Sequence, residues 1–380
     1  MIKIQKLNSA IVLAVSVFGI LLAAPAFAAQ GTADSSGNRS DVYERARVIS
    51  VSTGTVSSGL LEDGATGKGP AGLVAEVEVI GGDDKGKLMT AQYEIGIAGK
   101  LAAGDEVVIN KPGGDENSAY VVDPYRLNRL SWFILLFFAV AIYFGRRRGL
   151  FAILGLVISV FIIFYYLVPR IIAGGSPLGV SLVAAFFITV ISLFVAHGIS
   201  KRTAIAFVST ILSLVIAIVT DLVLVYSTKL TGTGSEEAVY LQFGTSPVDL
   251  QGILLAGILI GVLGILDDIT TAQAACVEEI HNANPSFSMK ELYRRGLSVG
   301  REHIASLINT LVLAYVGISL PMILLIMSSK GGTLWVVMNS GFMAEEIVRT
   351  LVGSLVLVVA VPLTTFLASY LYSRPKSGMM

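Results

Sequence analysis

Long apolar runs separated by short polar segments fill the last two thirds of the chain, and this pattern predicts membrane-spanning helices. Seven spans are predicted within a transmembrane domain of residues 130–372, at 130–145, 149–168, 178–197, 203–226, 249–267, 304–327 and 347–372. The first span is shorter than the about 20 residues that a crossing needs. Trp132 and Tyr143 nevertheless lie where an aromatic belt is expected. The predicted fold class is a polytopic α-helical membrane protein.

Residues 42–128 show a different pattern, in which short alternating runs are broken by glycines. The predicted strands are 46–51, 73–80, 87–94, 106–110 and 120–122. Alternation is clearest in Ala75–Val79, which places apolar and acidic side chains on opposite faces. Glycines in Gly81–Gly86 predict a turn. Five short strands in about 80 residues predict a small all-β barrel of the OB or SH3-like kind.

The start of the chain has the features of a secretory signal peptide, which we assign to residues 1–28. Lys3 and Lys6 precede an apolar run, and Ala26–Ala28 provides a small-x-small cleavage site. An uncleaved anchor is the alternative. Residues 29–41 are rich in glycine and serine and predict a flexible linker. Both alternatives place the β-domain outside the cell membrane.

The distribution of basic residues fits this orientation when each span reverses direction. The segments then predicted to face the cytosol contain Arg146, Arg147, Arg148, Lys201, Arg202, Lys290, Arg294, Arg295, Arg301, Arg374 and Lys376, whereas the outer loops between spans hold only Arg170, Lys229 and Lys330. Cytoplasmic loops carry such an excess of Lys and Arg. We therefore expect a multi-pass protein of the cell membrane with an extracytoplasmic β-domain and a cytosolic tail at 373–380.

Composition supports the membrane assignment and narrows the partners. Hydrophobic residues make up 54% of the chain and charged residues 14%, and the mean hydropathy is +0.76. The 27 basic and 27 acidic residues balance, so no charge excess favours nucleic acid as a partner. The single cysteine, Cys276, excludes an intramolecular disulfide.

Several short patterns resemble those of the YibE/F-like membrane proteins. They are Gly82–Lys87, Gly104–Val108, Asp123–Arg126, Gly264–Asp268 and Asn309–Gly317, spread over nearly the whole mature chain. The resemblance implies a membrane architecture and no catalytic residues. It leaves the cofactor undetermined.

The stretch Gly261–Glu279 holds four carboxylates at the end of the fifth span and just beyond it. Acidic residues at membrane depth are energetically costly, so they suggest function. If the helix continues past the membrane, Asp267, Asp268 and Thr271 share one face with the later acids Glu278 and Glu279. Asp267 and Glu278 would lie about 16 Å apart along the axis, too far to bind one ion. We expect Glu278 and Glu279 to be solvated.

Three explanations for Asp267 and Asp268 remain open. The first is a structural ion pair with Arg301 at the mouth of the sixth span. The second is an ion or proton site, with a metal held by Asp267, Asp268 and His303. Carboxylates alone favour hard cations, and an added imidazole shifts the preference toward Zn²⁺ or Fe. The third is a catalytic carboxylate pair.

Other polar positions lie within the spans. Asp221 lies near the outer end of the fourth span, where Arg349 is a candidate partner. Asn309 in the sixth span is expected either to contact a neighbouring helix or to line a pathway. The small residues of Gly257-x-x-x-Gly261 predict close helix packing.

The connection at 268–303 is expected to be cytosolic and to contain a short helix. Ser288-x-x-Glu291 is a capping box that would open this helix. The chain has neither an HExxH nor a Walker A motif. We expect a transporter or permease for an ion or small solute, embedded in the lipid bilayer. The alternatives are an interaction protein, with a partner protein on the β-domain or cytosolic helix, and a membrane enzyme.

Overall fold

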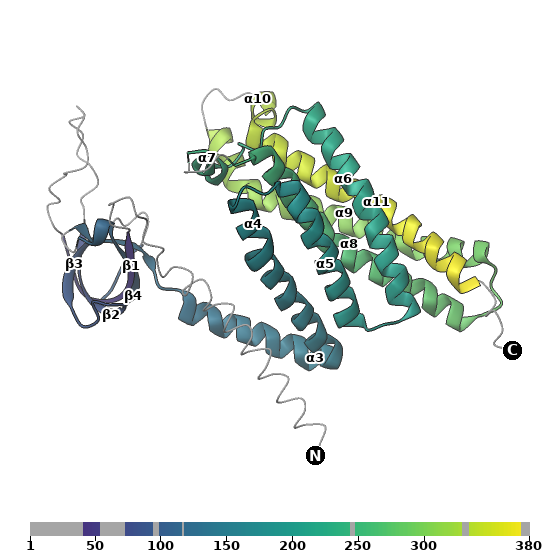
Figure 1. Cartoon of the computed structure of the whole chain (residues 1–380), viewed down its shortest axis with the longest axis horizontal. Coiled ribbons are helices and arrows are strands. Elements are labelled where there is room, and N and C mark those ends of the chain that lie inside the picture. The colour runs from purple at the N-terminus through teal and green to yellow at the C-terminus, as the bar shows by residue number, and fades with distance from the viewer. Residues whose placement is uncertain are drawn as a thin grey trace, which may run out of the picture. The chain divides into compact units, whose positions relative to one another are not determined.

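The computed structural model describes residues 41–53, 73–93, 99–115, 118–243, 248–328 and 334–373. They divide into two compact units, a barrel unit that ends at Val140 and a helical unit that begins at Ala141 (Figure 1). The predicted signal peptide, the predicted linker up to residue 40 and the tail after residue 373 lie outside the described residues.

Five strands form a closed barrel in the first unit. They are β1 (Val42–Thr53), β2 (Leu73–Gly81), β3 (Leu88–Tyr93), β4 (Glu106–Lys111) and β5 (Tyr120–Pro124). The strand order is β1-β2-β3-β5-β4, and β4 pairs back with β1. All pairs are antiparallel except the parallel pair β3–β5. Each predicted strand overlaps one of these.

Alternation along the strands creates the barrel core. In β2, Ala75, Val77 and Val79 are fully buried while the acids between them face outward, as the sequence predicts. The predicted turn at Gly81–Gly86 is also present. Gly82 and Gly86 there have φ of 105° and 89°, values that suit glycine because it has no Cβ.

The helical unit is built mainly from long apolar helices. The described helices are α3 (Leu127–Ile162), a π-helical turn (Ile163–Leu167), α4 (Val168–Ile172), α5 (Pro177–His197), α6 (Lys201–Ser227), α7 (Glu236–Gln242), α8 (Leu250–Ala283), α9 (Met289–Ser328), α10 (Leu334–Met338) and α11 (Gly341–Ser373). Six helical segments among the described residues are long and apolar enough to cross a membrane. A multi-pass membrane protein is therefore confirmed.

The first of these six segments contains two predicted spans. It runs from Leu127 to Ile172, over 46 residues. Arg146 interrupts it with φ 51° and ψ −130°, which is not helical. The segments before and after this break pack closely, because a Cβ on Gly149 would overlap the carbonyl oxygen of Ala141. The break falls between the spans predicted at 130–145 and 149–168.

Helix α8 lies at the centre of the helical unit, where it contacts α5, α6, α9 and α11 (Figure 1). Its apolar residues, such as Leu259, Leu266 and Ile269, are almost completely buried among residues of α5, α6 and α11. Most of the large apolar side chains in the second half of α9 are exposed instead. The apolar side chains of α8 therefore form the core of the unit, whereas those of the second half of α9 lie on its surface.

The predicted connection 268–303 is mostly helical and forms no separate short helix. Helix α8 continues to Ala283, and α9 begins at Met289 and runs without interruption into the sixth span. The backbone N–H of Glu291 donates to Ser288 Oγ at 3.3 Å, so the predicted cap opens α9 itself. The two long helices leave only 284–288 as the link between them.

Close helix packing occurs at a different pair of glycines from the predicted one. A Cβ on Gly257 or Gly261 would find its nearest neighbour at 3.7 or 3.9 Å, an ordinary contact distance. On α9, a Cβ on Gly296 would meet Thr365 Cγ2 at 2.9 Å, and one on Gly300 would overlap Val361. The small-xxx-small motif that brings helices together is therefore Gly296-x-x-x-Gly300.

Candidate functional site

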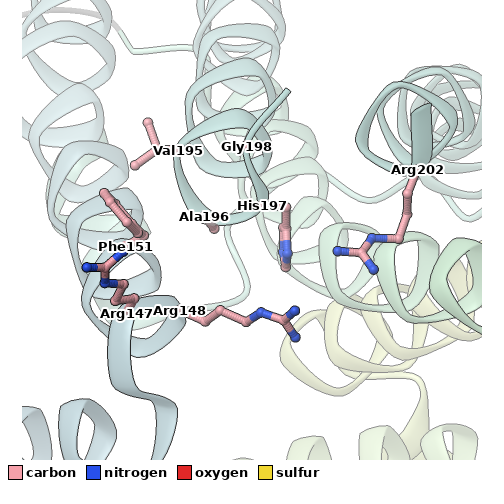
Figure 2. A pocket seen from close by; sticks show the side chains of 8 residues that line it. All are labelled: Arg147, Arg148, Phe151, Val195, Ala196, His197, Gly198 and Arg202. Carbon is pink, nitrogen blue, oxygen red and sulfur yellow. The ribbon is translucent and has the colours of Figure 1, made fainter. Parts of the chain in front are cut away.

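A first cavity of about 350 Å³ opens where the break in α3 meets the turn between α5 and α6 (Figure 2). It is lined by Arg147, Arg148, Phe151, Val195, Ala196, His197, Gly198 and Arg202. Three arginines and a histidine thus surround one space, and none of its lining residues is acidic.

A second cavity of about 400 Å³ lies at the other end of α6. It is lined by Thr228, Lys229, Leu230, Thr231, Met338, Asn339, Gly341, Ala344 and Glu345. The Glu345 side chain accepts a hydrogen bond from the Gly234 backbone N–H at 3.0 Å. Arg202 and Thr228, which line the two cavities, are 26 residues apart (228 − 202), or about 39 Å along α6.

A line of buried polar side chains runs along α6 between the two cavities. Thr203, Thr210 and Asp221 are 2% exposed or less. Their spacings of 7 and 11 residues place them within about 20° of one another around the helix. Ser213 is also fully buried and lies about 60° around the helix from Thr210. This line faces the interior of the unit, because α6 packs on α8 and α11.

Asp221 is the most deeply buried acid of the helical unit, with 2% of its surface exposed. Its Oδ1 has no hydrogen-bond partner. The expected partner Arg349 interacts with it electrostatically, but its ion pair is with Glu346, at 3.3 Å. Within the described ranges, Asp221 forms no ion pair. A buried carboxylate without a paired cation is costly.

Asp267 and Asp268 have different surroundings, although they are adjacent. Asp267 is half-buried, and its Oδ2 accepts a hydrogen bond from Ser192 Oγ on α5 at 2.6 Å. Its Oδ1 is buried without a partner. Asp268 is exposed and interacts electrostatically with His197 of the first cavity. The acidic pair therefore lies close to the cationic cavity.

The expected ion pair with Arg301 is not formed. Arg301 is exposed, and in the part of the chain that the structure describes neither Asp267 nor Asp268 has an ion pair. The reason is the helical geometry of α8, which directs Asp267 toward α5, whereas Arg301 belongs to α9.

The candidate metal ligands do not converge. No group of three or more His, Cys, Asp and Glu among the described residues is placed to hold a metal ion. His303 therefore does not join Asp267 and Asp268 in a three-ligand site, and its Nδ1 is buried without a partner. Thr271 is half-buried on α8, and its Oγ1 also lacks a partner. The described residues of the site thus contain polar atoms without hydrogen-bond partners, but they form no three-ligand metal centre.

Two further expectations about polar residues are changed by the structure. Asn309 is exposed on α9, so it does not line the interior with Asp221 and Asp267. Glu278 is half-buried rather than fully solvated, and it accepts hydrogen bonds from Arg202 at 3.2 Å and from the Tyr372 hydroxyl at 2.9 Å. Glu279 is exposed, as expected.

Sequence reasoning missed the buried polar contacts that join the helices of the site. Thr210 and Thr270 share a hydrogen bond of 2.7 Å between α6 and α8. Gln273 Nε2 donates to the Gly296 carbonyl oxygen and to Thr365 Oγ1, both at 2.8 Å. These contacts connect α6, α8, α9 and α11 in one polar layer.

Sequence reasoning also missed that Gly296–Gly300 has the GxSxG spacing of hydrolase nucleophiles, but the structure excludes that role. The motif requires a sharp strand-to-helix turn that exposes the serine. Ser298 instead lies inside the continuous helix α9. The two glycines serve helix packing.

Comparison with known proteins identifies the family of the chain. The family described as YibE/F-like protein matches residues 133–374, which is more than half of the chain. The chain belongs to the YibE/F-like protein family. The match contains both cavities and the polar line of α6, whereas the barrel lies before it. No curated protein and no solved structure matches this YibE/F-like protein significantly.

Proposed function

We propose that this YibE/F-like protein transports an ion or small solute along the polar face of α6. The observation that carries the proposal is the line of buried polar side chains, Thr203, Thr210, Ser213 and Asp221, between two cavities at opposite ends of one helix. Polar groups inside a membrane protein are costly and typically mark ion or substrate pathways. Thr210 also joins α6 to α8 through Thr270, but Ser213 Oγ and Asp221 Oδ1 have no hydrogen-bond partner that would explain them as packing contacts.

The proposed topology has seven spans. As one straight helix, Leu127–Ile172 would be about 69 Å long, more than twice the about 30 Å of a hydrocarbon core. The break at Arg146 therefore supports two crossings. The positive-inside rule then assigns the first cavity to the cytosolic side and the second to the outer side.

Asp221 and Asp267 are the proposed exchange groups of the pathway. Each has a buried carboxylate oxygen without a hydrogen-bond partner. Such an atom is available to a proton, a cation or a polar solute that passes it. Asp267 lies toward the cytosolic cavity and Asp221 toward the outer one, so the two provide successive stations.

The test is flux through the purified protein in liposomes. Currents on solid-supported membranes would be recorded for a panel of protons, alkali cations, divalent cations and small anions. We expect at least one species to give a protein-dependent current that falls more than tenfold in Asp267→Asn. Glu279→Gln, an exposed carboxylate on the same helix, is the matched control. Equal currents in wild type and Asp267→Asn for every conducting species would reject the proposal.

A second candidate is an interaction protein that acts through the barrel. The strand order β1-β2-β3-β5-β4 supports an OB-type assignment. Tyr43 and Leu88 on its surface are 61% and 63% exposed, as expected for a contact surface. Deletion of the barrel separates the candidates, because a transporter would keep its current while an interaction protein would lose its cellular function despite an intact helical unit.

A further inference from the structure

We propose that the first cavity binds a phosphate-type oxyanion between Arg148, His197 and Arg202. This inference goes beyond the proposed transport function, because the polar line of α6 requires no anion. It rests on the geometry, the unmet hydrogen-bonding capacity and the charge of this cavity.

The three side chains come from three different elements and converge. Figure 2 shows Arg148 of α3 and Arg202 of α6 extending toward the space beside His197, the last residue of α5. Both guanidinium groups interact electrostatically with His197. Arg147 lies beside Phe151 and points away from the other three (Figure 2). Arg147 and Arg148 are consecutive helical residues, so their side chains leave the helix about 100° apart.

The cationic groups of the cavity are only partly neutralised by the protein. Arg202 pairs with Glu278 at 3.2 Å, and its Nε is buried without a hydrogen-bond partner. Arg148 has no ion pair within the residues that the structure describes. Asp268, which also acts on His197, is exposed and pairs with neither arginine. Like charges held together are unfavourable until an anion joins them.

Guanidinium groups favour oxyanions with several acceptor oxygens. The planar donor fork of arginine matches phosphate geometry and forms short, charge-assisted hydrogen bonds. A cavity of about 350 Å³ that opens to the surface admits either free phosphate or the phosphate of a lipid headgroup. The shared chemistry is a tetrahedral phosphate group, and the experiment has to distinguish its two sources.

The experiment uses the full chain with two probes. Inorganic phosphate would be titrated into protein in phosphatidylcholine nanodiscs by calorimetry, at constant ionic strength. In parallel, native mass spectrometry would count retained phosphatidylglycerol. The variants are Arg148→Gln and Arg202→Gln, with Arg301→Gln as the control, an exposed arginine of equal charge that does not line the cavity.

We expect one probe to bind at a single site. Loss of one charge-assisted contact should weaken that binding about tenfold or more in Arg148→Gln, with at most a twofold change in Arg301→Gln. A response to phosphate identifies a free anion, and a response only to phosphatidylglycerol identifies a lipid. Arg202→Gln also loses the ion pair with Glu278 and could unfold for that reason. In that case the result for Arg148→Gln decides. No binding of either probe, or equal weakening by Arg301→Gln and Arg148→Gln, would overturn the proposal.

Discussion

Buried charged side chains of the barrel form ion pairs, whereas the most deeply buried acid of the helical unit forms none among the described residues. In the barrel, Lys111 Nζ lies 2.6 Å from Glu44 Oε2 and 2.5 Å from Asp84 Oδ2. In the helical unit, Asp221 is just as buried, yet one of its oxygens has no partner. The barrel cluster joins β1, β4 and the turn between β2 and β3, whereas Asp221 joins no elements through an ion pair.

This contrast separates structural charges from functional ones. Removing one member of a buried ion pair leaves the other uncompensated and strongly destabilises a protein. A buried acid that forms no ion pair offers no such stability, so its presence inside the membrane calls for another cause. We therefore assign a stabilising role to the barrel cluster and propose a functional role for Asp221.

The largest effect on stability is expected from Lys111→Met in the barrel. The change leaves Glu44 buried beside an apolar side chain, which should cost about 3–5 kcal/mol of barrel stability. Hydrogen exchange of β1 and β4 peptides in the full chain would report it, with unchanged protection of α8. Lys100→Met, which alters an exposed lysine of the same unit, should have little effect.

The double variant Glu44→Met, Lys111→Met sharpens this prediction. With both charges removed, most of the lost stability should return, because replacing both partners of a buried pair by apolar groups is often neutral. Equal exchange in wild type and Lys111→Met would show that the cluster does not hold the barrel together.

A smaller loss of stability is expected from Gly300→Ala in the helical unit. This change creates a steric overlap between helices and removes no ion pair. The added methyl would overlap Val361 and lie about 3 Å from the amide of Gln273. We expect a loss of about 1–3 kcal/mol, as for overpacked cores, measured by thermal unfolding in detergent. Gly317→Ala on the same helix meets nothing within 4 Å and should be neutral or stabilising. Equal melting of the two variants would contradict this account of α9.

The smallest effect is the acid sensitivity of the barrel cluster. Hydrogen bonds to Lys111 and Lys87 lower the pKa of Asp84 from 3.8 to about 2. Because the folded pKa is the lower one, the contribution of Asp84 is complete above about pH 4 and is lost toward pH 2. The stability gap between wild type and Asp84→Asn should therefore close over that range. A gap that is constant from pH 5 to pH 2 would contradict the assignment, and Asp83→Asn is the exposed control.

At the alkaline end, Lys111 reports on the same cluster. Burial lowers its pKa, but hydrogen bonds to Asp84 and Glu44 outweigh burial and raise it above 10.5. A raised lysine pKa contributes stability that is present below about pH 10.5 and is lost as the pH rises through the folded value. The two limits define the range over which the cluster stabilises the barrel.

Much of the fold follows from sequence periodicity. The five strands of the barrel and the apolar spans were predicted because alternation and apolar length depend on local residues alone, as in Ala75–Val79. The continuation of the fifth span past Asp268 was only a supposition in the sequence analysis, and the structure contains it as α8. The unbroken helix from Ser288 into the sixth span was missed, because a polar capping box in a predicted loop does not reveal how far its helix extends.

The candidate site was predicted only in part, because partners depend on helix packing. Asp221 and Asp267 were identified from their cost inside a membrane. Arg349 acts on Asp221 electrostatically but forms its ion pair with Glu346, and Asp267 bonds to Ser192 instead of pairing with Arg301. Ser192 and Thr270 had no signal beyond being single polar residues in apolar helices. The spacing of Thr203, Thr210 and Asp221 was visible in the sequence and is the signal that would have located the polar line.

The most direct test compares flux with stability in one variant, Asp221→Asn. Since no ion pair is lost, we expect its unfolding free energy in detergent to change by less than about 1 kcal/mol. The current of the conducted species in liposomes should fall more than tenfold. A variant that conducts normally, or one that loses current only because it unfolds, would contradict the assignment of Asp221 to function rather than to structure.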